Sequence, residues 1–381
     1  MTNRGEAAMQ GIGLYIHVPF CAGKCPYCDF YSVAPVPQLR EDYTAALLRA
    51  LGHLPAGAAG SPLATVYFGG GTPNLLGAGA LCRVLGAARQ AFALQPGAEV
   101  TAEVNPGSVT PDQLALLRQG GFNRLSMGLQ SAQPDELALL GRKHSPADVE
   151  HTVAAARGAG FENISLDLML GTPGQTVQSA LASADFCAGL GVQHLSAYLL
   201  KVEPGTPFGR AHMERRLADP DALADLYLAV CARLEQLGYR QYEISNFARP
   251  GFESRHNLCY WLGGDYLGLG PAAHSLWRGQ RHFFARDAAA FAAAPDPFAL
   301  WQDDGEGGTR EEFIMLRLRL AQGLDLDELE RRWPGQQAET LRLRRQLGPM
   351  VRAGLARLQG PVFRLTPRGF LVSNSIIARL I

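Results

Sequence analysis

The chain of 381 residues has almost no lysine, no long apolar run and no net charge. Lysine occurs only at positions 24, 143 and 201. No run of about 18 apolar residues is present, so the sequence predicts no membrane-spanning helix. The first residues lack a basic start followed by an apolar core, so we expect no secretory signal and a cytoplasmic protein. Zero net charge removes any global attraction to nucleic acid or to a membrane surface.

A disulfide framework and a phosphate-binding loop are missing as well. Four of the seven cysteines are scattered in apolar surroundings, unlike those of a disulfide-stabilised domain; they are Cys82, Cys187, Cys231 and Cys259. The pattern G-x4-G-K-[ST] does not occur. A hydrophobic fraction of 47% and a charged fraction of 18% are typical of a globular protein. The length predicts two or three domains, or one barrel with an appendage.

The other three cysteines lie on one short stretch with the spacing C-x3-C-x2-C. Cys21, Cys25 and Cys28 follow an apolar run, residues 14–18, that predicts a strand, and no fourth cysteine is near. Soft thiolates bind zinc or iron–sulfur clusters, but a structural zinc site is closed by four protein ligands. A [4Fe–4S] cluster on three cysteines keeps one iron open, so the incomplete set favours a cluster. Three unrelated surface cysteines are the alternative, but thiols so close together would oxidise readily.

Predicted strands and predicted helices alternate six times in the first part of the chain. The strands cover residues 14–18, 65–68, 100–104, 124–129, 164–170 and 194–200, and the helices cover residues 39–51, 78–92, 111–119, 134–140, 147–159 and 177–190. This alternation predicts an α/β fold with a parallel sheet and right-handed crossovers. A doubly wound open sheet competes with a barrel, but it needs a reversal of strand order that the sequence does not reveal.

Polar and glycine-rich residues fall where the predicted strands end. The cysteines follow the first strand, three glycines at 69–71 follow the second, and Glu103, Gln130 and Asp167 mark the next three. In barrel-like α/β folds the functional site lies at this end of the strands, so the pattern favours a barrel. The glycines alone are weak evidence, because they also suit a tight turn.

Five motifs lie in order along the same part of the chain. They are YIHVPFC at 15–21, FGGGTP at 68–73, EVNP at 103–106, SMGLQS at 126–131 and DLMLGTPG at 167–174. Together with the cysteine spacing and the aromatic Tyr27, they resemble the oxygen-independent coproporphyrinogen III oxidase group of radical S-adenosylmethionine (SAM) proteins. The resemblance implies a partial (β/α)6 barrel with a [4Fe–4S] cluster on Cys21, Cys25 and Cys28, and with SAM on the open iron.

The same resemblance implies a set of SAM-contacting residues but no catalytic residue. They are Tyr15, Gly70, Gly71, Thr72, Glu103, Gln130, Arg142 and Asp167. A guanidinium can hold the SAM carboxylate by paired hydrogen bonds, and the acidic and amide side chains can bind its ribose hydroxyls and ammonium group. A solvated charge at a helix end is the alternative interpretation of Arg142.

Three features resemble the HemW branch of this group, the heme chaperones, more than the oxidases. The oxidases carry a fourth cysteine two positions after the third, but this chain has Asp29 and then Phe30 after Cys28. The oxidases also carry an N-terminal extension, but here only a short segment precedes the first predicted strand. The stretch HNLCYW at 256–261 resembles the branch motif H-N-x-x-Y-W and makes His256 a candidate heme ligand. A hydrogen-bonded structural histidine is the alternative. The glycine-rich residues 267–274 could bring a second histidine, His274, close, but we expect them instead to form a turn that covers the barrel mouth.

The C-terminal part predicts a small, mostly helical, winged-helix-like domain after a linker at residues 304–308. Its predicted helices cover residues 310–321, 326–332 and 339–358, with a β pair near 362–365 and a last helix from Phe370. Residues 331–368 contain nine arginines and only one acidic residue. An apolar stripe interleaves with them and indicates a core-facing side: Leu341, Leu343, Leu347, Val351, Leu355 and Leu358. The charge therefore favours docking of an acidic partner or of heme propionates over DNA.

The sequence thus predicts three parts, residues 1–215, 216–304 and 305–381, and one leading function. We expect a heme chaperone without coproporphyrinogen oxidase activity, which holds a [4Fe–4S] cluster, SAM and heme. Its expected partner is a heme-acceptor protein, such as a respiratory hemoprotein. The acceptor can be a membrane protein, although this chain has no predicted membrane segment of its own. We expect no binding of nucleic acid. The alternatives are a radical SAM coproporphyrinogen III oxidase, which decarboxylates propionate side chains, and a DNA-binding regulator.

Overall fold

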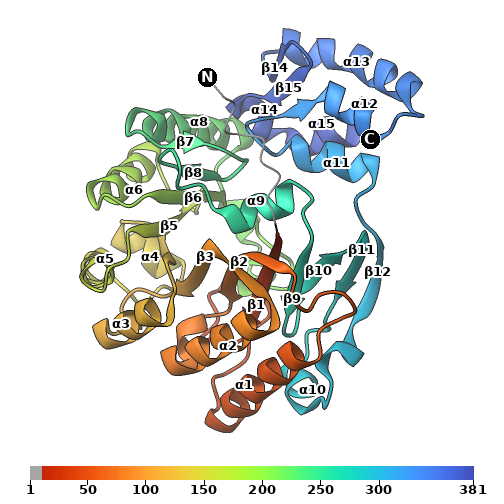
Figure 1. The fold of residues 1–381 in the computed structure, drawn as a ribbon. Helices are drawn as coiled ribbons and strands as arrows, with labels where there is room; N and C mark the ends of the chain where they lie inside the picture. The colour runs from red at the N-terminus through yellow and green to blue at the C-terminus, as the bar shows by residue number, and fades with distance from the viewer. Residues whose placement is uncertain (1–10) are drawn as a thin grey trace.

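Six parallel strands form the centre of the computed structural model, which describes residues 11–381. They are β1 (Ile12–Val18), β2 (Pro62–Gly70), β3 (Ala93–Val104), β4 (Arg124–Gln130), β5 (Asn163–Leu170) and β6 (His194–Leu199). They lie side by side in chain order, without the reversal of a doubly wound sheet. The predicted partial (β/α)6 barrel is confirmed (Figure 1). Residues 1–10, where we expected no signal, lie outside the described residues.

Helices cover the outer face of these strands (Figure 1). They are α1 (Pro37–Gly52), α2 (Ala78–Ala91), α3 (Pro111–Gly120), α4 (Pro134–Leu139), α5 (Pro146–Gly158) and α6 (Val177–Gly189), with the short η1 (Pro73–Leu76). Thr110, Ser145 and Thr176 begin α3, α5 and α6 with capping boxes, which satisfy free backbone N–H groups. Strand residues such as Leu14 and Leu166 are fully buried in the main hydrophobic core.

The sheet continues beyond both edges of the six strands to twelve strands. On the β6 side lie the antiparallel β8 (Asn246–Ala248) and β7 (Arg240–Gln241). On the β1 side, β9 (Tyr266–Leu269) is parallel to β1, followed by the antiparallel β10 (His274–Trp277), β11 (Gln280–Phe283) and β12 (Gln302–Glu306). The remaining helices of this body are α7 (Pro207–Arg210), η2 (Met213–Arg216), α8 (Pro220–Gln236), α9 (Arg255–Trp261), α10 (Ala288–Ala293) and η3 (Pro297–Leu300).

Two predictions about these outer strands were wrong. The glycine-rich stretch from residue 267 begins as β9 rather than as a turn, because Leu267 and Leu269 are buried between their neighbours. Gly268 allows this close packing, since an added Cβ would lie 2.2 Å from His274 O. Residues 304–306, which we expected in a linker, pair with β11 as the end of β12.

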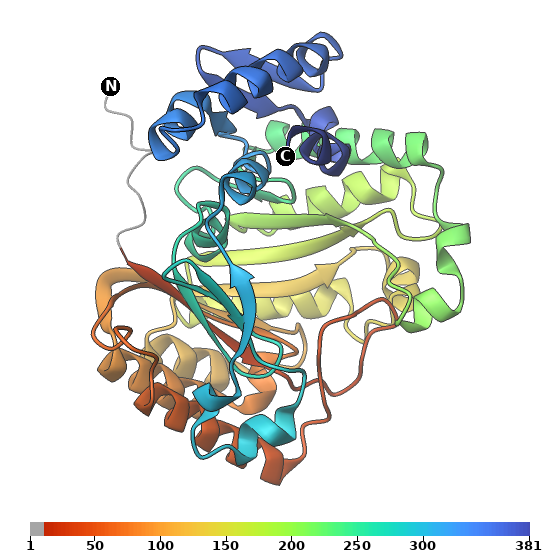
Figure 2. The ribbon, with the colours of Figure 1, turned by 90° about the vertical axis from the view of Figure 1, so that its right-hand side faces the viewer.

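The C-terminal part has its own core and confirms the predicted winged-helix-like fold. It contains α11 (Arg310–Arg317), β13 (Leu324–Asp325), α12 (Leu326–Arg332), α13 (Gln337–Arg352), β14 (Ala356–Gln359), β15 (Val362–Leu365), α14 (Pro367–Leu371) and α15 (Ser373–Leu380). The strands form a small antiparallel sheet in the order β13-β15-β14. This part lies beside α8 and α9 (Figures 1 and 2). None of the described helices is both long and apolar enough to cross a bilayer.

The predicted helix at 339–358 and its apolar stripe were partly wrong. The helix ends at Arg352, because Gly354 adopts a left-handed φ of 71° and the chain then enters β14. Leu343 and Leu347 are buried as expected, but Leu341 is 55% exposed and Leu358 is 46% exposed. Two leucines of the stripe therefore lie at the surface among the arginines.

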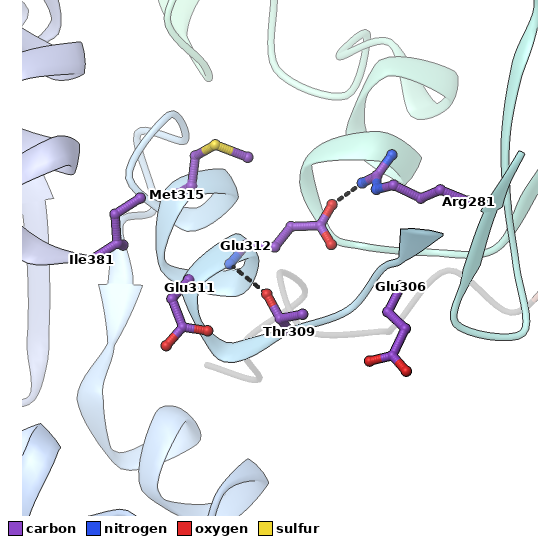
Figure 3. Close-up of a pocket in the computed structure, with 7 residues that line it drawn as sticks. All are labelled: Arg281, Glu306, Thr309, Glu311, Glu312, Met315 and Ile381. Atoms are coloured by element: carbon purple, nitrogen blue, oxygen red, sulfur yellow. Dashed lines mark hydrogen bonds and ion pairs between the residues drawn. The ribbon is translucent and has the colours of Figure 1, made fainter. Parts of the chain in front are cut away.

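One partly buried carboxylate joins the C-terminal part to the edge of the sheet. Glu312, near the start of α11, forms an ion pair with Arg281 of β11 (Figure 3). It also accepts a hydrogen bond from Gly308 N at 2.6 Å, while its own backbone N donates to Thr309 Oγ1 at 3.2 Å. The side chain thus helps to begin α11 and to fix that helix against β11.

Candidate functional site

The three predicted cluster ligands lie on the loop that leaves β1 at the C-terminal end of the sheet. The thiols of Cys21, Cys25 and Cys28 are free and half-buried. The loop is closed at its base, since Cys21 N donates to Val33 O at 3.0 Å and Val33 N donates to Pro19 O at 2.6 Å. Burial raises the pKa of Cys28, and the charges of Cys25 and Cys21 raise it further. A cationic iron group would relieve this penalty, so three thiolates in this position fit a cluster with one open iron.

The glycine-rich loop after β2 packs directly against the cysteine loop. Gly71 N donates to Val18 O at 2.9 Å, and Thr72 N donates to Phe20 O at 2.7 Å. An added Cβ at Gly71 would lie 2.6 Å from Phe20 O, so only glycine fits there. Gly70 has a left-handed φ of 112°, and an added Cβ would lie 2.5 Å from an imidazole ring. Packing inside the protein explains these glycines, and their contact with SAM stays a prediction.

Arg142 connects the ends of neighbouring strands to the cysteine loop. Its guanidinium donates to Asn105 Oδ1 at 3.1 Å and to Gly128 O at 2.8 Å, and it lies 3.6 Å from Cys25 Sγ. Asn105 Nδ2 in turn donates to Thr72 Oγ1 at 3.0 Å. The guanidinium is therefore not a freely solvated charge at a helix end. Asn105 was missing from the predicted site, although its position directly after β3 was a usable signal.

Glu103 on β3 and Asp167 on β5 are two desolvated carboxyl groups that influence each other. Glu103 accepts hydrogen bonds from Tyr67 Oη at 2.8 Å and from Gly70 N at 3.1 Å. Burial raises the pKa of Glu103 to about 7 and that of Asp167 to about 6, and the charge of Asp167 adds to the shift of Glu103. A neighbouring cation would return both groups to their charged form. The pair therefore fits the ammonium and hydroxyl groups that SAM carries.

Tyr15 and Gln130 are the remaining predicted SAM-contacting residues. Tyr15 Oη lies 3.0 Å from His17 Nδ1, and its ring centre lies 6.2 Å from that of Tyr67. Gln130 ends β4 with a φ of 71°, which is uncommon for a residue with a side chain. The register of β4 shifts between Gly128 and Gln130, so the strand ends in an irregularity. Backbone strain of this kind is concentrated at functional sites.

The structure brings most of the eight predicted residues into two neighbouring groups. Gly71, Thr72 and Arg142 lie against the cysteine loop, and Gly70, Glu103 and Asp167 form the second group. Tyr67, which hydrogen-bonds to Glu103, is not among the predicted residues, because nothing in the sequence separates it from the apolar residues around it in β2. Both groups come from the ends of strands and from the loops that follow, as the barrel fold predicts.

His256, on α9, packs against β1 and β2, and its ring centre lies 6.4 Å from that of Tyr15. Its side chain is buried, with Nδ1 2.8 Å from Thr65 Oγ1 and Nε2 2.6 Å from Tyr260 Oη. The ring stacks on Tyr67 at 5.1 Å, and burial lowers the pKa of His256 to about 3. Its backbone N donates to Glu99 Oε1 at 3.0 Å. A heme iron needs a free ring nitrogen, so ligation by His256 requires loss of one of these hydrogen bonds.

Two family models match the chain. A model described as the radical SAM superfamily matches residues 15–187, which contain the cysteine loop and all eight predicted SAM-contacting residues. A model described as the HemN C-terminal domain matches residues 309–372.

Known proteins resemble the chain over most of its length. A heme chaperone HemW of Mycobacterium tuberculosis is 39% identical over 389 residues, which cover 99% of this chain and 97% of the relative. HemW of Escherichia coli is 41% identical over 264 residues, which cover 69% of this chain and 69% of the relative. The solved structure of the radical SAM enzyme coproporphyrinogen III oxidase (HemN) from Escherichia coli has a TM-score of 0.82 and 25% identity, covering 97% of this chain and 90% of that chain.

Proposed function

Because the chain belongs to the HemW family of heme chaperones within the radical SAM superfamily, we propose that it binds heme and transfers it to an acceptor protein. The observation that carries this proposal is the identity of 39% to a heme chaperone along 99% of the chain. The sequence after the cluster cysteines supports it, since Asp29 and Phe30 follow Cys28 where the oxidases have a further cysteine.

The proposed cofactors are a [4Fe–4S] cluster on Cys21, Cys25 and Cys28, and SAM at the neighbouring strand ends. When bound, the cluster supplies one-electron chemistry to SAM. The chain's own residues orient and charge the site: Arg142 places a cationic hydrogen-bond donor 3.6 Å from the sulfur of Cys25. Glu103 and Asp167 accept hydrogen bonds from cationic or hydroxyl groups of the bound SAM. In this proposal residues 1–215 form the part that carries the cluster and SAM sites, and residues 216–304 and 305–381 form two further parts.

The acceptor docks, in this proposal, on the basic surface of the C-terminal part. The exposed arginines of the C-terminal part that form no ion pair among the described residues include Arg331, Arg342, Arg345, Arg352 and Arg357. Leu341 and Leu358 are exposed among them, so the surface offers apolar and positive contacts together. An acidic protein surface is complementary to this combination. DNA binding would instead weaken steeply with salt, and we expect no binding of duplex DNA at low salt.

An anaerobic heme titration of the cluster-loaded protein, followed by a transfer assay, tests the proposal. We expect the Soret band to saturate near one heme per chain. The loaded protein should then convert an apo-hemoprotein to its holo form faster than free heme at the same concentration of heme does. Absence of saturable binding would overturn the chaperone function.

A second candidate function is the oxygen-independent coproporphyrinogen III oxidase reaction, which the fold match to HemN favours. Its test is an anaerobic assay with coproporphyrinogen III, SAM and a reductant. Sustained formation of the decarboxylated porphyrinogen would establish this enzyme activity and overturn the expectation of a chaperone without it. We expect no product above the level of a Cys21→Ala variant.

A further inference from the structure

We propose that heme binds in the hollow beside His274, with His274 as its axial ligand, rather than at His256. This inference rests on the proposed heme-binding function and names its site. The hollow has a volume of about 320 Å³ and lies at the edge of the sheet between β10, β12 and the segment after β11. Its lining includes Ala272, His274, Phe283, Arg286 and Asp304.

The imidazole of His274 is arranged as a metal ligand. Its side chain is 57% exposed, and Nδ1 lies 3.6 Å from Asp304 Oδ2. Within residues 11–381, Nε2 has no hydrogen-bond partner. Histidine ligands of metals usually direct the second ring nitrogen to a carboxylate or carbonyl, which sets the tautomer and strengthens the ligand. Asp304 Oδ2, at 3.6 Å, is beyond hydrogen-bond distance but is the carboxylate nearest to Nδ1, so a small shift would bring it into that position and leave Nε2 free for iron.

The other walls of the hollow have the chemistry of a porphyrin edge. His274 is paired with Phe283 across β10 and β11, and the two rings stack at 5.6 Å with an angle of 23°. An axial imidazole stands perpendicular to the porphyrin, so Phe283, nearly parallel to the imidazole, would contact the macrocycle with its edge. Arg286 is 63% exposed, and its nearest acid, Asp29, is 3.7 Å away, so the guanidinium can reach a propionate.

The hollow opens at the same end of the barrel as the cysteine loop. Gly270, in the turn before His274, packs against the end of β1, where an added Cβ would lie 2.7 Å from His17 O. The segment after Arg286 is held by Tyr31, whose hydroxyl accepts a hydrogen bond from Ala288 N at 2.9 Å. Asp29, the partner of Arg286, directly follows the cluster cysteine Cys28. Heme at His274 would therefore lie beside the loop that holds the cluster.

None of the other histidines in residues 11–381 combines exposure, a free nitrogen and these neighbours. His17, His194 and His256 are buried with both ring nitrogens hydrogen-bonded. His282 stacks on Trp301 at 4.2 Å, on the other face of the same strand pair. The remaining four, His53, His144, His151 and His212, have no aromatic ring stacked beside them among the described residues.

The test is a hemin titration of the full-length, cluster-loaded protein and of matched variants, read in the Soret and visible bands. His274→Ala should weaken binding by about tenfold or more and change the ligand-dependent bands, and added imidazole should restore the bands. Asp304→Asn should weaken binding by up to about tenfold with the fold intact. Arg286→Gln should weaken binding about tenfold through loss of a charged hydrogen bond. The control is His151→Ala, which removes an exposed histidine on α5 and should change nothing.

The outcomes separate this inference from the proposed function. Normal heme binding by His274→Ala, together with loss of the spectrum in His256→Ala, would overturn the site at His274 and leave the chaperone function standing. Failure of the wild-type protein to bind hemin would overturn the proposed function, and the site with it. Restoration of the wild-type bands by imidazole in His274→Ala would support the axial role and exclude a general loss of folding.

Discussion

The guanidinium of Arg142 lies 3.6 Å from the thiol sulfur of Cys25, although the two residues are 117 positions apart in the chain. The same side chain donates to Asn105 and to the backbone of Gly128. A cation fixed beside a cysteine favours its thiolate, which is the form that binds iron. One arginine thus joins the cysteine loop to the ends of the strands that follow it, and couples the cluster position to the SAM position.

Replacing Arg142 by glutamine should reduce cluster loading. Without the guanidinium, the sulfur of Cys25 loses its neighbouring cationic donor, and Asn105 and Gly128 lose theirs. We expect slower anaerobic reconstitution and less bound iron and sulfide per chain, measured by chemical analysis and absorbance. Lys143→Gln is the matched control, since it removes the adjacent exposed charge. Equal loading of both variants would contradict the role of Arg142.

Replacing Cys21 by alanine should abolish the cluster and, with it, the binding of SAM to the open iron. Two remaining thiolates cannot hold the cube, because three of its irons need protein ligands. Iron and sulfide analysis and the cluster absorbance measure the result. Cys82→Ala removes a half-buried thiol of α2 and should load normally. Unchanged cluster absorbance in Cys21→Ala would show that the site is misassigned.

Glu103 should make the cluster-free protein less stable at alkaline pH. Burial raises its pKa from 4.5 to about 7, so the folded state favours the protonated form. The resulting stability is fully present below pH 4.5 and is lost as the pH rises through about 7. Glu103→Gln should remove this dependence, which amounts to up to about 3 kcal/mol between pH 5 and pH 8.

Urea unfolding of the cluster-free protein at both pH values measures the effect of Glu103. The control is Glu162→Gln, which neutralises an exposed carboxylate next to β5. A wild-type stability that is as high at pH 8 as at pH 5, or a Glu103→Gln variant with the wild-type pH dependence, would contradict the assignment.

Replacing His256 by alanine should destabilise the fold whether or not heme is present. The change opens a cavity and leaves the hydroxyls of Thr65 and Tyr260 without their partner. Loss of such a buried network costs roughly 2–4 kcal/mol. His274→Ala, at an exposed position, should change the free energy of unfolding by less than about 0.5 kcal/mol. Urea unfolding of the heme-free proteins distinguishes the two, and equal stability of both variants would contradict the structural role of His256.

The barrel and the cysteine loop were predictable from sequence because their signals are local. Each strand of the barrel is an apolar run that ends in polar or glycine residues, and the three ligands lie within one loop. The network around Arg142 was not predictable, since it joins residues from four segments that meet only in the folded chain. For the same reason the sequence could not show that the two nitrogens of His256 are both engaged, while Nε2 of His274 is free.

Two of the errors have a common physical cause, which is pairing with strands distant in the sequence. The stretch at 267–270 looks like a turn because of its glycines, but pairing with β1 makes it β9. Residues 304–306 look like part of a linker, but pairing with β11 makes them the end of an edge strand. Such non-local pairing overrides the preference of glycine and aspartate for loops. The domain boundaries drawn from composition alone stay a prediction.

The ion pair between Arg281 and Glu312 should hold the C-terminal part against the edge of the sheet. Glu312→Ala removes both the pair with β11 and the acceptor for Gly308 N at the start of α11. The side chain of Glu312 is 11% exposed, so the loss should exceed that of a surface pair and reach about 1–3 kcal/mol. The matched control is Glu311→Ala, one residue earlier and exposed. Hydrogen exchange should become faster in residues 302–312 of the Glu312 variant only, and equal protection in both variants would show that the pair does not fix α11 to the sheet.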